Sequence, residues 1–143
     1  MVPQLSLLPM IQEISPTQTY PLRHQVLWPD EPIEFVKVPD DEEGIHLGYF
    51  LDEKLVSVIS LFVDDYKIAR FRKFATHPDL QRKGIGSQLL KATFERAQSA
   101  GASMLWCDAR LDAQPFYERF GMKPEGGIFH KGAIPYVKMS TTL

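Results

Sequence analysis

The spacing of hydrophobic residues changes along the chain, and each spacing predicts a different element. Residues 10–14 predict a first strand, and Ser15 or Thr17 is a candidate cap for a helix that runs to about Leu27. Residues 28–44 contain prolines, a glycine and a run of acidic residues, so they are expected to form an exposed loop. Loops of this kind often carry specificity.

Three apolar runs rich in β-branched residues follow this loop. They cover residues 46–51, 55–63 and 67–76, and short polar segments separate them. Runs of this composition, joined by short polar turns, are typical of hairpins. The chain is therefore expected to form three antiparallel strands in succession.

The hydrophobic period changes to that of a helix between Ile85 and Ala100. Apolar residues fall on one helical face there, whereas Lys91 and Glu95 fall outside it. Gly101 is expected to end this helix, because glycine is common just past a helix C-terminus.

The last third of the chain returns to short elements. It predicts a strand at 104–107, a short helix at 113–120 ended by Gly121, and one or two strands within 128–140. Strands and helices of this size belong to an α/β (α+β) fold. The length of the chain fits one domain over residues 1–143.

Composition narrows the classes of partner. The chain has 143 residues, of which 44% are hydrophobic, so it can bury a core without a disulfide or metal staple. Lys and Arg number 16 against 18 Asp and Glu, which gives a formal net charge of −2. This balance gives no overall electrostatic reason to bind nucleic acid or anionic lipid. No nucleic-acid partner and no membrane association are expected, and any basic site must be local.

Cysteine and histidine usage suggests neither a metal site nor a secreted protein. Cys107 is the single cysteine and lies in an apolar run, so it is expected to be a small buried hydrophobe, and the four histidines lack ligand spacing. No stretch approaches the ~20 apolar residues of a membrane span. The N-terminal segment has two prolines and no basic residue before Arg23, unlike a signal peptide. A cytoplasmic location is expected.

The start of the helix at Ile85 is the most informative segment, because two basic residues and two glycines surround it. Gly84 and Gly86 let a ligand approach the backbone closely, and the N–H groups of a first helical turn have no partners within the helix. With Arg82 and Lys83 they predict a cradle for an anion. The spacing fits neither a P-loop nor a dinucleotide fingerprint, and a plain helix cap is the alternative.

Two elements stand in a recognisable order: QRKGIG at residues 81–86 and AQPFYERFGM at residues 113–122. They resemble the Q/R-x-x-G-x-G/A and A-x-x-F-Y-x-x-x-G-F elements of the GCN5-related N-acetyltransferase (GNAT) family, with Met122 in place of the last phenylalanine. The resemblance covers roughly residues 10–140. It implies a central, mostly antiparallel mixed sheet flanked by helices, and an N-acetyltransferase that uses acetyl-CoA and no metal.

The same resemblance implies where the site lies. The donor would lie between the strand that ends at Thr76 and the strand at 104–108, with backbone donors around Ala75 and Thr76 polarising the thioester carbonyl. Tyr117 would act as a general acid that protonates the departing coenzyme A. The residues implied to bind acetyl-CoA are Phe74, Ala75, Thr76, Gln81, Arg82, Lys83, Gly84, Ile85, Gly86 and Ser87.

The resemblance further implies a primary amine of a small molecule or a peptide as acceptor. Trp28 and the acids at 40–43 are expected to border its site, where the acids would suit a cationic amine. Dimers are common in the family, so a homodimer is one expected assembly. The amine must lose a proton before it attacks, and water is one candidate base. The side chains that are candidates by type are Asp30, Glu31, His77, Asp108 and His130.

Two other functions remain open from the sequence. Because no residue stands out as the base, one alternative is a regulatory module that binds coenzyme A and catalyses nothing. The other is a module that binds a different nucleotide in the same cradle. Asp108 and Arg110 are interpreted as structural charges rather than as substrate contacts.

Overall fold

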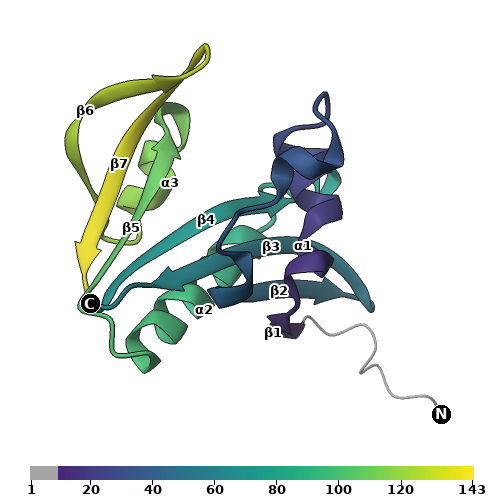
Figure 1. Ribbon diagram of the computed structural model, residues 1–143, viewed down its shortest axis with the longest axis horizontal. Coiled ribbons are helices and arrows are strands. Elements are labelled where there is room, and N and C mark those ends of the chain that lie inside the picture. The colour runs from purple at the N-terminus through teal and green to yellow at the C-terminus, as the bar shows by residue number, and fades with distance from the viewer. Residues whose placement is uncertain (1–9) are drawn as a thin grey trace.

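The computed structural model describes residues 10–143, which form a seven-stranded mixed sheet with helices on both faces (Figure 1). Residues 1–9, which bear on the expectation about a signal peptide, lie outside the described residues. The strands are β1 (Met10–Ile14), β2 (Ile45–Leu51), β3 (Lys54–Val63), β4 (Ile68–Thr76), β5 (Met104–Arg110), β6 (Lys123–Lys131) and β7 (Ile134–Thr142). Their order across the sheet is β1-β2-β3-β4-β5-β7-β6, and the predicted fold class is confirmed.

The helices vary in type and length more than the strands do. They are α1 (Pro16–Leu22), the π-helical turn η2 (Arg23–Leu27), α2 (Ile85–Ser99) and α3 (Gln114–Glu118), with 3-10 turns η3 (Ile33–Val36), η4 (Asp41–Glu43), η5 (Pro78–Leu80) and η6 (Leu111–Ala113). None of the described helices is long and apolar enough to cross a membrane.

The first helix begins where the sequence predicts. Ser15 caps α1 in a capping box with Gln18: the Gln18 amide donates to Ser15 Oγ, and the Ser15 amide donates to Gln18 Oε1 at 2.8 Å. The predicted helix does reach Leu27, but its last five residues, η2, are π-helical. Such π-helical turns often mark functional segments.

The two faces of the sheet bury separate apolar clusters. Helix α2 places Leu89 and Leu90, both fully buried, against the larger cluster on one face. On the other face, Leu22 of α1 packs with Val58 and Ala75 in a smaller cluster. The predicted helix at 85–100 and its apolar face are thus confirmed, and Gly101, with φ of 81°, follows its C-terminus.

The sheet separates in its middle. β4 and β5 pair in parallel over three residue pairs, from Ile68↔Met104 to Arg70↔Trp106, and all the other described pairs are antiparallel. Beyond those pairs the two strands diverge, as Figure 1 shows to the right of the C-terminus. β5 is longer than predicted and runs to Arg110, while β6 begins at Lys123 rather than after residue 128.

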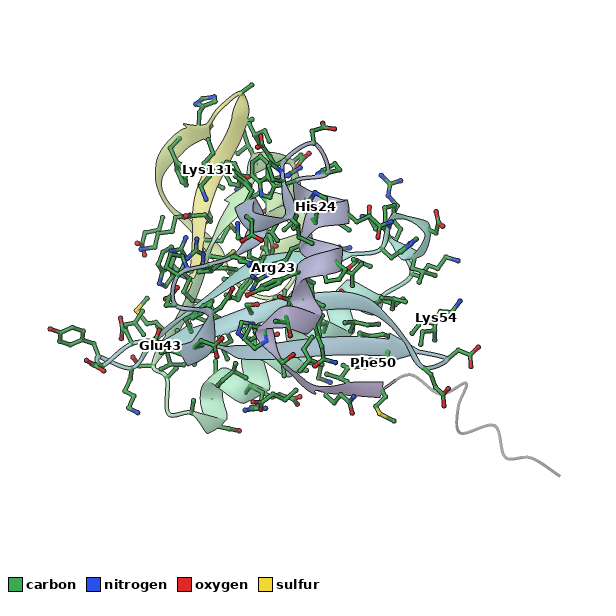
Figure 2. The ribbon with its side chains drawn as sticks, turned by 45° about the vertical axis from the view of Figure 1, so that its right-hand side comes forward. Arg23, His24, Glu43, Phe50, Lys54 and Lys131 are labelled. Atoms are coloured by element: carbon green, nitrogen blue, oxygen red, sulfur yellow. The ribbon has the colours of Figure 1, made fainter. Side chains whose placement is uncertain are left out.

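The prediction that residues 28–44 form an exposed loop is wrong for part of that segment. Two 3-10 turns, η3 and η4, lie in it, and Val36, Val38 and Asp41 are buried. The cause is Arg23, whose guanidinium is fully buried beneath the segment and donates to the Val36 carbonyl at 3.0 Å. Figure 2 shows Arg23 where the chain of α1 and η2 lies over the sheet.

Arg23 and Asp41 form a buried bidentate ion pair. Both contacts between the guanidinium nitrogens and the carboxylate oxygens measure 2.9 Å, and Arg23 also donates to Ser60 Oγ at 2.9 Å. His46 Nε2 lies 2.8 Å from the Asp41 carbonyl, so this nitrogen carries the proton, and Nδ1 accepts from Ser60 at 2.7 Å. The network joins η2, η4, β2 and β3.

Replacing Asp41 by asparagine removes the charge that Arg23 needs while keeping the side-chain size. The Asp41→Asn variant is expected to lose about 3–5 kcal/mol of unfolding free energy, because it leaves a buried guanidinium without a counter-charge. Urea unfolding measures this loss. Glu42→Gln, an exposed acid in the same turn, is the matched control and is expected to change stability little. Equal stability of Asp41→Asn and wild type would contradict the importance of the pair.

The same pair gives stability a dependence on pH. Burial alone would raise the pKa of Asp41, but hydrogen bonds from Arg23 and the Val38 amide outweigh it and lower the pKa below its ordinary value. The contribution of Asp41 is therefore fully present above the ordinary carboxyl pKa and is lost as the pH falls through the lowered one. The stability gap between wild type and Asp41→Asn is expected to narrow in that acidic range.

Candidate functional site

The edge of β4 that faces the gap is irregular. Its register with β3 shifts between Val58 and Ser60, opposite Lys73 and Phe74, and Lys73 has a φ of 55°. Such a β-bulge bends a strand and redirects its side chains. From Phe71 onward this edge of β4 has no strand partner among the described residues. Backbone groups on it are therefore free to pair with an extended ligand.

Gln81 shows which backbone groups of β4 face outward. Its side-chain amide donates to the Thr76 carbonyl at 3.0 Å, whereas the next amide, of His77, donates inward to the Val56 carbonyl. In an antiparallel ladder the N–H and C=O of one residue point to the same side. The Thr76 backbone thus faces away from β3, and Gln81 ties the end of β4 to the loop before α2.

A cavity of about 650 Å³ lies between this edge, the start of α2 and α3. Seven of the ten predicted donor-binding residues line it: Phe74, Thr76, Gln81, Arg82, Gly84, Gly86 and Ser87. Of the other three, Ala75 and Ile85 are buried in the two apolar clusters, so only their backbone is available to a ligand, and Lys83 is exposed outside the lining. The lining also includes Val26, Ala113, Phe116 and Arg119, which the sequence did not suggest.

The start of α2 opens onto this cavity as the glycine spacing predicts. Gly84 is its N-cap, with a φ of 83° that suits glycine, and it offers no side chain to cap the first-turn N–H groups. A Cβ on Gly86 would meet the Phe74 ring at 3.3 Å, so the backbone is closely approached there. Arg82 has a φ of 65° and turns the chain just before the helix. Uncapped N–H groups with nearby cations suit a diphosphate.

A second cavity of about 480 Å³ lies on the other side of Phe74 and Ala113, and both of these residues line both cavities. Tyr117 lines the second cavity and is only 9% exposed. Burial raises the pKa of Tyr117 above its ordinary value, and nearby Cys107 raises it further, so the phenol stays protonated over the whole neutral range. It can therefore donate a hydrogen bond but cannot serve as a base.

Cys107 also lines the second cavity, yet it is suited to packing rather than chemistry. Its side chain is 2% exposed within the larger apolar cluster. Burial raises the pKa of the thiol well above its ordinary value, and the Asp108 charge adds to this effect. The reactive form of cysteine is the thiolate, so this thiol is inert at neutral pH. The expectation of a small buried hydrophobe is confirmed by its burial.

Of the candidate bases, the structure brings Asp108 alone into the lining of the second cavity. Its carboxylate lies 3.0 Å from Arg70 Nη2 and 3.5 Å from Lys131 Nζ. Its partners are these two cations rather than Arg110, with which the sequence had grouped it. Both cations thus already occupy this carboxylate as ion-pair partners. Asp30, Glu31, His77 and His130 are outside the lining.

The structure separates the residues expected to border an acceptor. Trp28 lines the second cavity, whereas the acids at 40–43 are outside its lining and Asp41 turns inward to Arg23. Sequence reasoning left out four basic residues of this cavity, Arg70, Arg72, Lys73 and Lys131, and interpreted the fifth, Arg110, as a structural charge. The available signal was the cluster of basic residues in ARFRKF within a strand otherwise made of core residues.

Comparisons with known proteins identify the family of this chain. Residues 8–122 match the model of the acetyltransferase (GNAT) family, so the chain belongs to this family. The predicted enzyme class, N-acetyltransferase, is thereby confirmed. Within residues 10–143, no group of three or more His, Cys, Asp or Glu side chains is placed to hold a metal ion.

Individual relatives agree with this assignment. The chain is 31% identical over 127 residues to an N-acetyltransferase of Bacillus subtilis described as uncharacterized, YitI, covering 83% of this chain and 85% of that protein. The fold is similar to that of the ribosomal-protein-S18-alanine N-acetyltransferase of Escherichia coli, with a TM-score of 0.81, 18% identity and 94% of each chain covered. A Bacillus subtilis acetyltransferase in complex with CoA gives a TM-score of 0.72 at 19% identity, covering 94% of this chain and 97% of that one.

Proposed function

We propose that this protein transfers the acetyl group of acetyl-CoA to a primary amine by direct attack on the thioester. The observation that carries the proposal is the pair of cavities that meet at the gap between β4 and β5. One has an uncapped helix N-terminus for a diphosphate, and the other is open to an acceptor. Phe74 and Ala113 mark their junction, where the thioester would lie.

The chemistry of the residues that line the first cavity suits the parts of coenzyme A. The first-turn amides of α2 and the Arg82 side chain would hold the diphosphate, and Arg119, across the cavity, would add a second cation. The outward edge of β4, including the Thr76 backbone, would pair with the amide-bearing arm as an added strand does. Two of the remaining candidates, Ala75 and Ile85, would contribute only through their backbone. Lys83 would contribute only through its exposed charge.

The reaction needs a neutral amine, because an ammonium ion has no lone pair. The amine nitrogen attacks the thioester carbonyl carbon, the C–N bond forms, and the C–S bond breaks as the electron pair leaves with sulfur. Outward-facing N–H groups of β4 would stabilise the oxygen as negative charge develops on it. The nitrogen loses its extra proton, the sulfur gains one, and the products are an acetamide and coenzyme A.

Tyr117 would act on the sulfur atom that leaves with coenzyme A, as a hydrogen-bond and proton donor. A phenol with a raised pKa is a weaker acid than free tyrosine, so its main contribution is a hydrogen bond to the developing thiolate. The same burial that raises the pKa of the phenol also raises the proton affinity of the sulfur. The proton can therefore pass from Tyr117 to sulfur as the C–S bond breaks.

Removing the Tyr117 hydroxyl tests this role. Tyr117→Phe is expected to lower kcat by about 10²-fold, because the leaving sulfur loses its proton donor, while the Kd for acetyl-CoA stays nearly unchanged. Steady-state assay of thiol release and calorimetric titration measure the two quantities. Phe120→Leu, a change in the same segment that leaves the hydroxyl in place, is the control. An unchanged kcat in Tyr117→Phe would remove this residue from the mechanism.

A methyl group on Gly86 tests the position of the diphosphate. Gly86→Ala is expected to raise the Kd for acetyl-CoA by about tenfold, because a Cβ there prevents the close approach that backbone hydrogen bonds need. Alanine is favoured over glycine in a helix by about 1 kcal/mol, which offsets the tight contact with Phe74, so the variant should fold.

Gly127→Ala is the control for Gly86→Ala, since a Cβ there meets nothing within 4 Å. Calorimetric titration with acetyl-CoA, and with ATP and NAD for comparison, gives the measurement. Unchanged acetyl-CoA affinity in folded Gly86→Ala would mean that the diphosphate lies elsewhere. Equal binding of ATP would favour a nucleotide module, and tight coenzyme binding without turnover of any amine would favour a catalytically silent one.

A further inference from the structure

The second cavity is strongly cationic in a protein with an overall negative charge. Its lining has five basic side chains and one acid, Asp108. The basic residues are Arg70, Arg72 and Lys73 from β4, Arg110 from β5 and Lys131 from β6. The formal charge of the whole chain is −2, so this concentration of positive charge is local.

The β-bulge is what brings two of these cations together. Ala69 and Phe71 belong to the larger apolar cluster, so Arg70 and Arg72, which alternate with them, point to the opposite face. Strict alternation would send Lys73 into that cluster. The extra residue of the bulge instead places Lys73 beside Arg72 at the second cavity and returns the next ring, of Phe74, to the cluster.

β5 supplies the facing wall by simple alternation. Cys107 and Ala109 are buried in the larger apolar cluster, so Asp108 and Arg110 face the cavity. Lys131 approaches from the end of β6, where Figure 2 labels it on the β6–β7 hairpin. The cations therefore come from both sides of the gap between β4 and β5.

Ion pairs within the protein balance only part of the charge that lines this cavity. Asp108 is already shared by Arg70, at 3.0 Å, and Lys131, at 3.5 Å. Arg72, Lys73 and Arg110 form no ion pair with any residue in the range 10–143, although all three are partly buried. Half-buried cations without a counter-charge are costly unless a ligand supplies one.

Coenzyme A would not supply that charge here, because its diphosphate has a separate place. The uncapped start of α2, with Arg82 and Arg119, belongs to the first cavity. Neither arginine lines the second cavity, and none of the five cations lines the first. Of the two substrates, the acceptor is therefore the one that would place a counter-charge here.

We infer that the acceptor is a small primary amine that carries its own carboxylate or phosphate, bound by Arg72, Lys73 and Arg110. This inference rests on the proposed acetyl transfer. The volume of about 480 Å³ is within the range of small-molecule pockets. The guanidinium groups of Arg72 and Arg110 suit a planar carboxylate or a phosphate, because each can donate two parallel hydrogen bonds.

The positive charge of the second cavity would also favour the neutral form of the acceptor amine, which is the form that attacks. Lys73 is itself a primary amine in this cavity: burial lowers its pKa to about 8, and the charges of Arg72, Arg23 and Lys131 act in the same direction. An acceptor amine placed among these cations would lose its proton more readily for the same reason. The anionic group holds the acceptor there, so a dedicated base is not required.

Matched pairs of amines test the inference. The first series is ω-amino acids of increasing length, beginning with β-alanine, each compared with its amide; the second is O-phosphoethanolamine compared with ethanolamine. The anionic member is expected to have a kcat/KM at least about tenfold higher, and the two series distinguish carboxylate from phosphate. Release of the coenzyme A thiol gives the rate.

Charge-removing variants connect that preference to the named residues. Arg72→Gln and Arg110→Gln are each expected to raise the KM for the anionic amine by about tenfold, with a smaller fall in kcat and little change in the KM for acetyl-CoA. The KM of the neutral partner should not rise. Arg72→Lys, which keeps the charge, should recover part of the loss, and Lys91→Gln, an exposed position on α2, should change nothing. Thermal unfolding confirms that each variant is folded.

The outcomes separate the inference from the proposed function. Acetylation of the neutral amine as fast as of its anionic partner, or an equal rise of both KM values in Arg72→Gln, overturns the anionic acceptor while acetyl transfer stands. No turnover of any amine by folded protein that binds acetyl-CoA overturns the proposed function, and the acceptor inference falls with it.

Discussion

The short pairing of β4 with β5 is the constraint on which the site depends. Parallel strands in a sheet normally continue side by side, yet these two part after Arg70↔Trp106. Each strand remains anchored on its other side, β4 to β3 and β5 to β7 along its full length. The sheet can therefore open in the middle while both outer ladders remain, and among the described residues the edge of β4 beyond Arg70 has no strand partner. Both cavities lie along that opening.

The buried pair of Arg23 and Asp41 stabilises one border of this opening. Arg23 begins the π-helical turn η2, and η2 packs against β4 and supplies Val26, which lines both cavities. The carboxylate comes from a segment 18 residues further along the chain. A buried ion pair adds little net stability compared with apolar residues, but breaking it is costly, so it fixes the arrangement of the segments it joins. Asp41 thus shapes this border of the opening without lining either cavity.

Much of the architecture could be predicted from the sequence because its signals are local. The capping box at Ser15, the apolar runs of β2 to β4 and the glycines around the start of α2 each lie within a few residues of the structure they determine. The resemblance to the family then predicted how these elements are arranged in space. Tyr117 and most of the donor-binding candidates could be named for the same reason, and they border the cavities as a group.

What the sequence did not reveal depends on contacts between distant segments. The burial of Asp41 requires Arg23, and composition alone made residues 40–43 look like a solvated acidic loop. Lys73 reaches the second cavity because the β-bulge shifts its side chain to the other face of the sheet. A simple alternation of buried and exposed residues does not predict this shift. Arg110 and Lys131 lie near the basic residues of β4 only because of the strand order β5-β7-β6. The inferred acceptor therefore differs from the expected one in carrying an anionic group, because basic residues line the second cavity and the acids at 40–43 do not.

Residue-resolved hydrogen exchange with and without acetyl-CoA tests the central claim that the opening between β4 and β5 holds the donor. The account predicts slower exchange of amides on the outward edge of residues 71–76, including Thr76, and of residues 82–87 at the start of α2, with β6 unchanged. Binding of acetyl-CoA that leaves both segments unprotected, or that protects β6 instead, would contradict it.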